Sequence, residues 1–207
     1  MNTKIIAAAA VAAAFVGTPA FAQSEPVEAP TSGPRVEATV GWDRIVLDVD
    51  GDSGGKSGVT YGGEVGYDIR TSGGAVIGFY AGVDGATTKD CVADGTESAC
   101  VKAGRNFTAG ARIGGSLGLG SLVYVKGGYS NGRIDVDYED TAFPADNFEE
   151  GANLDGFHLG AGAEFGFSGN LYGKVEYNYT RYSTANDFGF DVDLDRHRVL
   201  GGVGVRF

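Results

Sequence analysis

The two histidines of the chain, His158 and His197, are the residues whose chemistry would most directly support catalysis. A hydrolase that uses a serine nucleophile holds the serine and a carboxylate close to one imidazole. Both histidines lie where apolar and polar residues alternate, so their same-face neighbours stand two positions away. Those neighbours are Asp195 and Val199 for His197 and two glycines for His158, with no serine in either set. The two histidines also point to opposite faces, so we expect no catalytic residues and no enzyme.

Clustered carboxylates suggest a second kind of chemistry, the binding of calcium. The pattern Asp-x-Asp-x-Asp occurs at 48–52 and at 191–195. A calcium loop of the EF-hand kind also needs glycine at its sixth position and glutamate at its twelfth. Serine and valine occupy those positions in the first segment, and arginine occupies the sixth position of the second. We therefore expect no metal site and no cofactor, and we interpret the acidic run at 134–155 as solvated loop surface.

Composition excludes several classes of protein. The chain has 207 residues, with 16 Lys+Arg against 27 Asp+Glu, and a net charge of −11. Its 36 glycines would cost a helical protein too much backbone entropy, yet they follow no collagen period. A hydrophobic content of 43% is too high for a disordered chain. The sequence contains no stripe of basic residues, so a nucleic-acid partner is not expected. One domain of sandwich or barrel size remains.

The N-terminus indicates export. Lys4 precedes an apolar run at 5–16, and Ala20-Phe21-Ala22 then supplies a small-residue cleavage site. This is the layout of a secretory signal peptide, because the run is too short to span a membrane as a helix. We assign 1–22 to a signal peptide, 23–34, with its three prolines, to a flexible tail, and 35–207 to the folded domain of barrel size.

The two cysteines, Cys91 and Cys100, lie in a polar stretch after the signal peptide. In an oxidising exported compartment such a pair is expected to form a disulfide. A metal site is the alternative, but no histidine is near and no second cysteine pair exists. We therefore predict a disulfide across one loop.

From Val36 onward the hydrophobic period is two, which indicates strands with one apolar and one polar face. The clearest alternation is at 59–70, and it recurs at 36–43, 77–84, 106–113, 123–129, 157–167, 171–180 and 198–207. Short links at 71–74, 116–121 and 168–170 alternate with long polar links at 48–57, 88–103, 134–155 and 184–194. Eight strands with links of alternating length predict an antiparallel up-and-down barrel.

The polar face is rich in glycine, which indicates that this face points into the barrel. Glycine weakens a solvent-facing strand, whereas a narrow eight-stranded lumen needs small residues. A soluble barrel of the lipocalin kind, the alternative, has no such need. The charges on this face nearly balance, as enclosed ions must. They are the acidic Glu37, Asp43, Glu64, Asp68, Glu164 and Glu176 and the basic Arg70, Arg112, Lys126, Lys174, Arg196, Arg198 and Arg206. We predict an all-β, eight-stranded transmembrane β-barrel with a charge network in its lumen.

The C-terminus ends in Phe207, preceded by alternate hydrophobics at Val203 and Val205. This ending resembles the C-terminal sorting signal of outer-membrane proteins. Residues 36–207 resemble, in pattern, the small OmpA-like or OmpX/opacity-type barrels that are often labelled porin family. The resemblance implies location in the Gram-negative outer membrane among lipopolysaccharide, and insertion by the β-barrel assembly machinery. We expect a monomer without the peptidoglycan-binding domain of full-length OmpA-type proteins.

Three functions are compatible with these expectations. The first is a structural or surface-interaction role, with a lumen closed by ion pairs. The second is a narrow, porin-like pore for small solutes. The third is an adhesin or surface receptor that acts through the long links at 88–103 and 134–155. Opposite charges across a small bore favour a salt-bridged plug, and hence the first function.

Overall fold

The computed structural model of the chain describes residues 32–49, 52–95, 97–118, 121–140, 142, 147–183 and 193–207. The predicted signal peptide at 1–22, most of the predicted tail and the link at 184–192 lie outside these residues. In the described ranges, no helix is long and apolar enough to cross a membrane.

Nine strands make up the described fold. They are β1 (Gly33–Val49), β2 (Asp52–Arg70), β3 (Ala75–Ala86), β4 (Lys89–Asp94), β5 (Glu97–Gly118), β6 (Ser121–Asp140), β7 (Phe148–Ser168), β8 (Leu171–Ser183) and β9 (Asp193–Arg206). Because β1 begins at Gly33, residues 33 and 34 belong to the barrel and not to the predicted tail.

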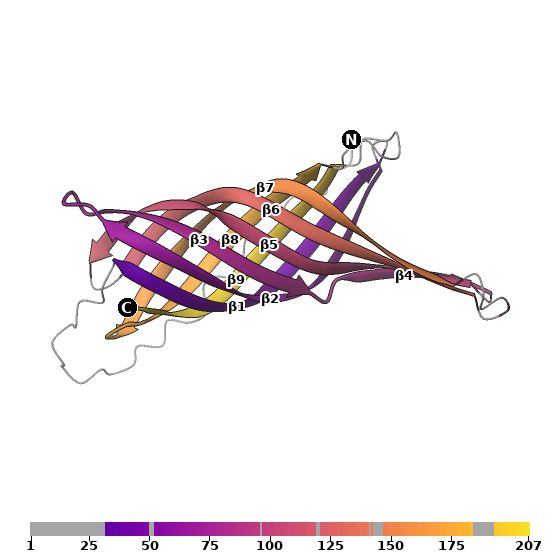
Figure 1. Cartoon of the computed structure of the whole chain (residues 1–207), viewed down its shortest axis with the longest axis horizontal. Coiled ribbons are helices and arrows are strands. Elements are labelled where there is room, and N and C mark those ends of the chain that lie inside the picture. Colours follow the sequence, from indigo (N-terminus) through magenta and orange to yellow (C-terminus); the bar gives the residue numbers. More distant parts are fainter. Residues whose placement is uncertain are drawn as a thin grey trace, which may run out of the picture.

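The strands form one antiparallel sheet in the order β3-β2-β1-β9-β8-β7-β6-β5-β4, and a further pairing of β3 with β5 closes the sheet into a ring. Eight strands make the ring, while β4 is attached outside it to β5. Figure 1 shows the ring as a cylinder of tilted strands. The predicted eight-stranded, up-and-down barrel is confirmed, and β4 is an addition to it.

Neighbouring residues of one strand differ in exposure as a barrel in lipid requires. The side of β5 that carries Arg112 is closed, with Arg112 itself 3% exposed, whereas the adjacent Ile113 is 54% exposed. Val65, Val125 and Val203 form part of the same exposed apolar wall. A wall of this kind would promote aggregation in water, whereas a bilayer covers it, and the closed ring leaves no strand edge unpaired in the hydrocarbon.

The inward glycines provide space for tyrosine rings that cross the lumen. A Cβ added at Gly110 would lie 2.6 Å from the hydroxyl of Tyr80, and one at Gly162 would lie 2.6 Å from the hydroxyl of Tyr124. A Cβ at Gly204 would meet the Tyr172 ring in the same way. Individual glycines of the polar face therefore make room for individual tyrosine rings. This role is more specific than the small size that a narrow bore alone requires.

Tight turns join the strands at one end of the ring. The backbone N–H of Thr71 donates to the carbonyl of Ala75 at 2.7 Å. Gly74 and Gly169 adopt φ values of 83° and 53°, a region that glycine enters without steric cost. The short links predicted at 71–74 and 168–170 are thus confirmed.

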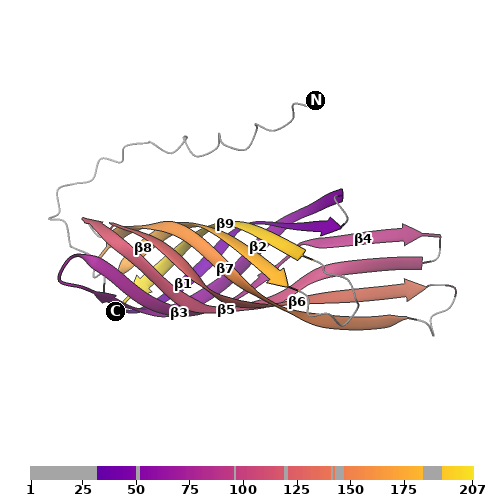
Figure 2. The ribbon, with the colours of Figure 1, turned by 90° about the horizontal axis from the view of Figure 1, so that it is seen from above.

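At the other end, four strands continue past the ring. We call this part the protruding sheet; it consists of β4 together with 97–103 of β5, 134–140 of β6 and 148–152 of β7. Figure 2 shows it extending beyond the barrel. A register shift in the β5–β6 pairing between Ala103 and Asn106 marks the boundary between ring and protruding sheet.

The prediction of long links at 48–57, 88–103 and 134–155 was wrong, because most of the described residues in these ranges are strand. The period of two in fact continues through 134–139, but acidic residues fill its polar positions, and such an acidic run is also typical of solvated loops. Strand pairing tolerates them because this sheet stands outside the hydrocarbon, where charged side chains on either face can reach water.

Candidate functional site: a closed lumen and a protruding sheet

Arg112 is the centre of the charge network in the half of the lumen nearer the tight turns. Its Nε and Nη2 donate to the two carboxylate oxygens of Asp68, at 2.9 and 2.5 Å. Its Nη1 donates to Oε1 of Glu164 at 2.5 Å, and Arg206 donates to Oε2 of Glu164 at 2.7 Å. Forked, charge-assisted contacts of this kind fix both partners in position. Four strands are tied together by them across the bore.

Two lysines extend this network toward the middle of the barrel. Lys174 donates to Glu37 at 2.5 Å and to Glu176 at 3.1 Å. Lys126 donates to Glu64 at 2.6 Å and to Glu176 at 3.3 Å. Each lysine bridges two carboxylates, and Glu176 is shared by both. Arg35 contacts Glu37, Glu64 and Asp68, and it thereby joins the lysine group to the Arg112 group in one continuous network.

A second group of ion pairs lies in the half of the lumen nearer the protruding sheet. Arg196 donates to Oδ1 of Asp43 at 2.6 Å, and the hydroxyl of Thr88 donates to Oδ2 of the same carboxylate at 2.6 Å. Arg198 donates to Asp84 at 2.6 Å. Asp43 is fully buried, so the Arg196–Asp43 pair lies in a part of the lumen that solvent does not reach.

His158 lies between the two groups of ion pairs, with both ring nitrogens engaged. Its Nε2 is 2.5 Å from the hydroxyl of Tyr80, and its Nδ1 is 2.8 Å from the hydroxyl of Ser130. The expectation that no serine accompanies a histidine was wrong here, because Ser130 comes from the neighbouring strand. All three side chains are buried. The adjacent polar cavity has a volume of about 30 Å³, which is room for about one water molecule.

The inward charges balance more closely than the sequence indicated. Arg70 was predicted to face the lumen, but it is exposed. It ends β2 at the rim, where no wall surrounds it. Arg35 and Asp84 were missed, although each shares the parity of an inward neighbour. The salt-bridged set comprises Glu37, Asp43, Glu64, Asp68, Asp84, Glu164 and Glu176 with Arg35, Arg112, Lys126, Lys174, Arg196, Arg198 and Arg206. Seven carboxylates thus face seven cations.

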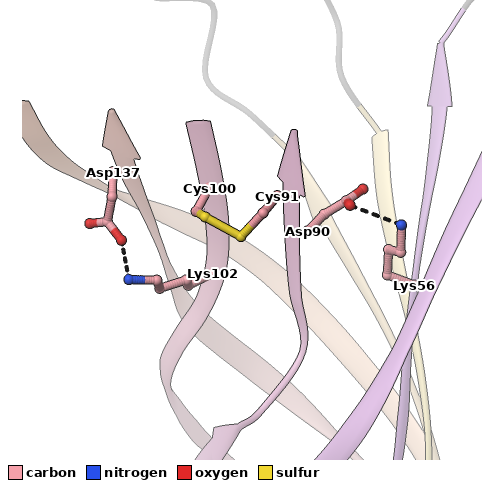
Figure 3. The surroundings of a disulfide bond; sticks show 6 residues. All are labelled: Lys56, Asp90, Cys91, Cys100, Lys102 and Asp137. Atoms are coloured by element: carbon pink, nitrogen blue, oxygen red, sulfur yellow. Dashed lines mark ion pairs between the residues drawn. A yellow bond between two sulfur atoms is a disulfide. The ribbon is translucent and has the colours of Figure 1, made fainter. Parts of the chain in front are cut away.

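The predicted disulfide is present, and it lies in the protruding sheet. Cys91 of β4 and Cys100 of β5 are direct cross-strand partners, with their Cα atoms 4.1 Å apart. Figure 3 shows an ion pair on each side of the bond. Lys56 of β2 lies 2.8 Å from Asp90, and Lys102 pairs with Asp137 of β6. The disulfide therefore links β4, which lies outside the ring, covalently to the ring strand β5.

Four outward arginines stand on the outer wall at the level where the ring gives way to the protruding sheet. We call this group the arginine collar; it consists of Arg44, Arg105, Arg133 and Arg181. Each stands two or four residues beyond an outward aromatic residue, and Arg105 lies over the ring of Phe107, 5.5 Å from its centroid. At this level of the wall, hydrogen bonds from Tyr129 and Asn131 lower the pKa of the Asp155 carboxyl. The wall here thus carries fixed charges of both signs.

The second histidine and the C-terminus lie on the outer wall. His197 is half-buried, and its Nδ1 is 2.7 Å from the hydroxyl of Tyr177, so it does not approach His158. Val203 and Phe207 are exposed, and the backbone N–H of Phe207 donates to the carbonyl of Pro34 at 2.8 Å. The end of the chain therefore completes the barrel wall beside β1.

Several solved structures are similar to the chain in fold. Neisserial surface protein A has 13% identity and a TM-score of 0.54, with 85% of this chain and 98% of that chain covered. Ail, the attachment invasion locus protein of Yersinia pestis, solved with the heparin analogue sucrose octasulfate, has 15% identity and a TM-score of 0.49 over 84% and 99% of the two chains. OprG of Pseudomonas aeruginosa has 12% identity and a TM-score of 0.42 over 87% and 98%. At these identities the likeness concerns the fold alone.

No curated protein sequence matches the chain. In contrast, the family described as "Outer membrane protein beta-barrel domain" matches residues 8–207, which is nearly the whole sequence. This match agrees with the closed ring, the apolar outer wall and the charged lumen. The chain belongs to the outer-membrane β-barrel protein family.

Proposed function

We propose that the protein is a non-conducting outer-membrane barrel whose role is structural and interactive: it anchors and displays the protruding sheet at the cell surface. The observation that carries this proposal is the set of buried ion pairs across the bore. A path for solutes would have to separate pairs such as Arg112–Asp68 and Lys174–Glu37, each with almost no exposure to solvent. Breaking one buried pair typically costs about 3–5 kcal/mol, so an open state is strongly disfavoured.

Lipopolysaccharide is the proposed surrounding of the outer wall. The arginine collar stands just beyond outward aromatic residues, at the end of the barrel that carries the protruding sheet; these residues are Trp42, Phe107, Tyr129 and Tyr179. Aromatic side chains in such a position are typical of the membrane interface. Guanidinium groups bind phosphate in a forked geometry, and lipopolysaccharide carries phosphates at this depth. The collar would therefore hold the barrel at a fixed height. Export, insertion by the barrel assembly machinery and a monomeric state complete the proposal.

A porin-like pore is the rival function, and the small polar cavity beside His158 is the feature that would serve it. That cavity holds about one water molecule and is lined by charged groups that are already paired, including Glu64 and Lys126. Catalysis is a weaker rival. Ser130 and His158 are within hydrogen-bond distance, but the second nitrogen of His158 contacts Tyr80, and no carboxylate orients it.

Planar-bilayer recording tests the proposal. The protein should give no steady conductance, because the ion pairs close the bore. Arg112→Gln and Glu64→Gln each remove one charge of the network, and Lys102→Gln, on the protruding sheet, is the matched control. Steady conductance of the unmodified protein that rises in the two lumen variants, but not in the control, would establish a gated pore instead.

A further inference from the structure

The two faces of the protruding sheet differ in chemistry. Directly paired residues share a face, so the registers place every strand. One face carries the disulfide with Lys102, Asp137 and Glu139. The other, on the side toward which the lumen side chains point, is called here the mouth-side face. Its central residues are all apolar: Val92, Ala99, Val101, Ala103, Ile134, Val136, Tyr138, Phe148 and Ala152.

This apolar face stands in the open, beyond the part of the barrel that lipid covers. Val92 is 71% exposed, Phe148 is 51% exposed and Val101 is 44% exposed. Tyr138 and Phe148 stack, with their ring centroids 5.4 Å apart. Contiguous apolar surface outside the hydrocarbon indicates contact with another apolar surface.

The mouth-side face leads into a groove at the mouth of the barrel. The groove has a volume of about 260 Å³ and lies between the protruding sheet and the hairpin of β1 and β2. Ile45, Val101 and Ile134 line it, together with Leu194. Leu194 packs below with Leu154 and the buried ring of Tyr182. The apolar surface is therefore continuous from the tip of the sheet down to the closed lumen.

Carboxylates stand at the tip and along one edge of the apolar surface, and an ion pair stands at the other edge. Asp90 is the cross-strand partner of Val101 at one edge, and Glu150 is the partner of Val136 at the other. Glu97 stands exposed at the tip, where its cross-strand partner Asp140 is buried and accepts a hydrogen bond from the backbone of Ala142. Asp90 forms an ion pair with Lys56, and Lys89 and Lys102 also line the groove, so the net negative charge of the border comes from the exposed Glu97 and Glu150. An apolar centre with an acidic border selects for a ligand of the complementary pattern.

We propose that the mouth-side face binds cationic amphipathic peptide segments. Their apolar side chains would lie on Val101 and the stacked aromatic pair, and their lysines or arginines would face Glu97 and Glu150. The inference rests on the proposed surface-interaction function and names its partner class. A second copy of the chain fits poorly, because it would bring like carboxylate borders together, and an anionic lipid is repelled for the same reason.

Fluorescence anisotropy with a labelled synthetic peptide of leucine and lysine tests the proposal. The full protein is held in nanodiscs of phosphatidylcholine, and empty nanodiscs give the background. The peptide should bind above background, and the same peptide with glutamate in place of lysine should not. Val101→Thr keeps the shape of the side chain, and it should weaken binding roughly fivefold through lost apolar contact.

A matched pair of glutamates tests which face binds. Glu150→Gln should weaken binding about threefold, as expected for an exposed ion pair, whereas Glu139→Gln, on the opposite face, should leave it unchanged. Three results would overturn the inference. They are equal effects of the two variants on binding, equal binding of the glutamate peptide, and self-association in sedimentation without peptide binding. Absence of peptide binding by a protein that is also non-conducting would overturn this inference alone, whereas steady conductance would overturn the proposed function.

Discussion

The guanidinium of Arg112 lies over the ring of Tyr124, with its Cζ atom 4.7 Å from the ring centroid. The hydroxyl end of Tyr124 approaches Gly162, where an added Cβ would lie 2.6 Å from it. Each inward tyrosine of this kind is thus held between a glycine of the wall and a cation of the network. The same arrangement recurs for Tyr80 with Lys126 and Gly110 and for Tyr172 with Arg206 and Gly204. The packing of the tyrosine rings against the wall glycines and the positions of the lumen cations therefore depend on each other.

Gly162→Ala should destabilise the barrel, because the added Cβ would lie 2.6 Å from the Tyr124 hydroxyl and 2.8 Å from the carbonyl of Val175. Overpacking of this kind typically costs about 1–3 kcal/mol. The temperature at which the folded form loses its faster migration in SDS gel electrophoresis measures the effect. Gly115→Ala is the matched control, because a Cβ there meets nothing within 4 Å. Equal loss in both variants would contradict the coupling.

Glu164→Gln should destabilise the barrel strongly, because Arg112 and Arg206 both donate to this carboxylate. The variant would leave Asp68 as the carboxylate that both arginines still contact, and breaking a buried ion pair typically costs about 3–5 kcal/mol. The midpoint of urea unfolding in lipid vesicles measures the change. Glu150→Gln, an exposed position on the protruding sheet, should shift the midpoint little. A similar shift in the two variants would argue against an energetic role for the network.

Replacement of Cys91 and Cys100 by serine should loosen the protruding sheet and leave the ring intact. The disulfide joins β4 to β5, and β4 is not part of the ring. Proteolysis of the variant in nanodiscs should cleave at 89–103 faster than in the disulfide-bonded protein. The heat-modifiable shift of the barrel should occur at the same temperature in both. A lower temperature of the heat-modifiable shift in the serine variant would show that the disulfide also stabilises the ring.

Arg44→Gln combined with Arg105→Gln should weaken retention of the protein in lipopolysaccharide. Both arginines belong to the collar and are exposed on the outer wall. Co-sedimentation with lipopolysaccharide vesicles at increasing salt concentrations measures the loss, and phosphatidylcholine vesicles should show no difference. Arg70→Gln, at the opposite rim, is the control. If the control reduced retention as much as the collar variant, phosphate binding by the collar would be contradicted.

The ring could be predicted from sequence because lipid imposes one rule on every spanning residue. Val65 and Ile113 must face hydrocarbon, and their neighbours must face the lumen, so a period of two persists through each strand. Aqueous surroundings impose no such rule on the protruding sheet. Val101 and Val136 alternate with charged residues in sequence, but only the register, which sequence does not provide, brings them side by side.

The partners within the lumen could not be predicted for the same reason. Parity places Asp68 and Arg112 on the inward side, yet their pairing depends on strands that are distant in sequence. Ser130 reaches His158 only through the pairing of β6 with β7. Arg35 has inward parity but precedes Val36, the first residue of the predicted strand. Arg70 also has inward parity, but parity alone does not reveal where the wall ends.

The pairing of β3 directly with β5 has an evolutionary consequence. The cylinder closes without any contribution from β4, so insertions or deletions between Ala86 and Asn106 leave the register of the eight wall strands untouched. Selection can therefore lengthen, trim or rewrite the segment that meets the outside world while the membrane anchor stays the same.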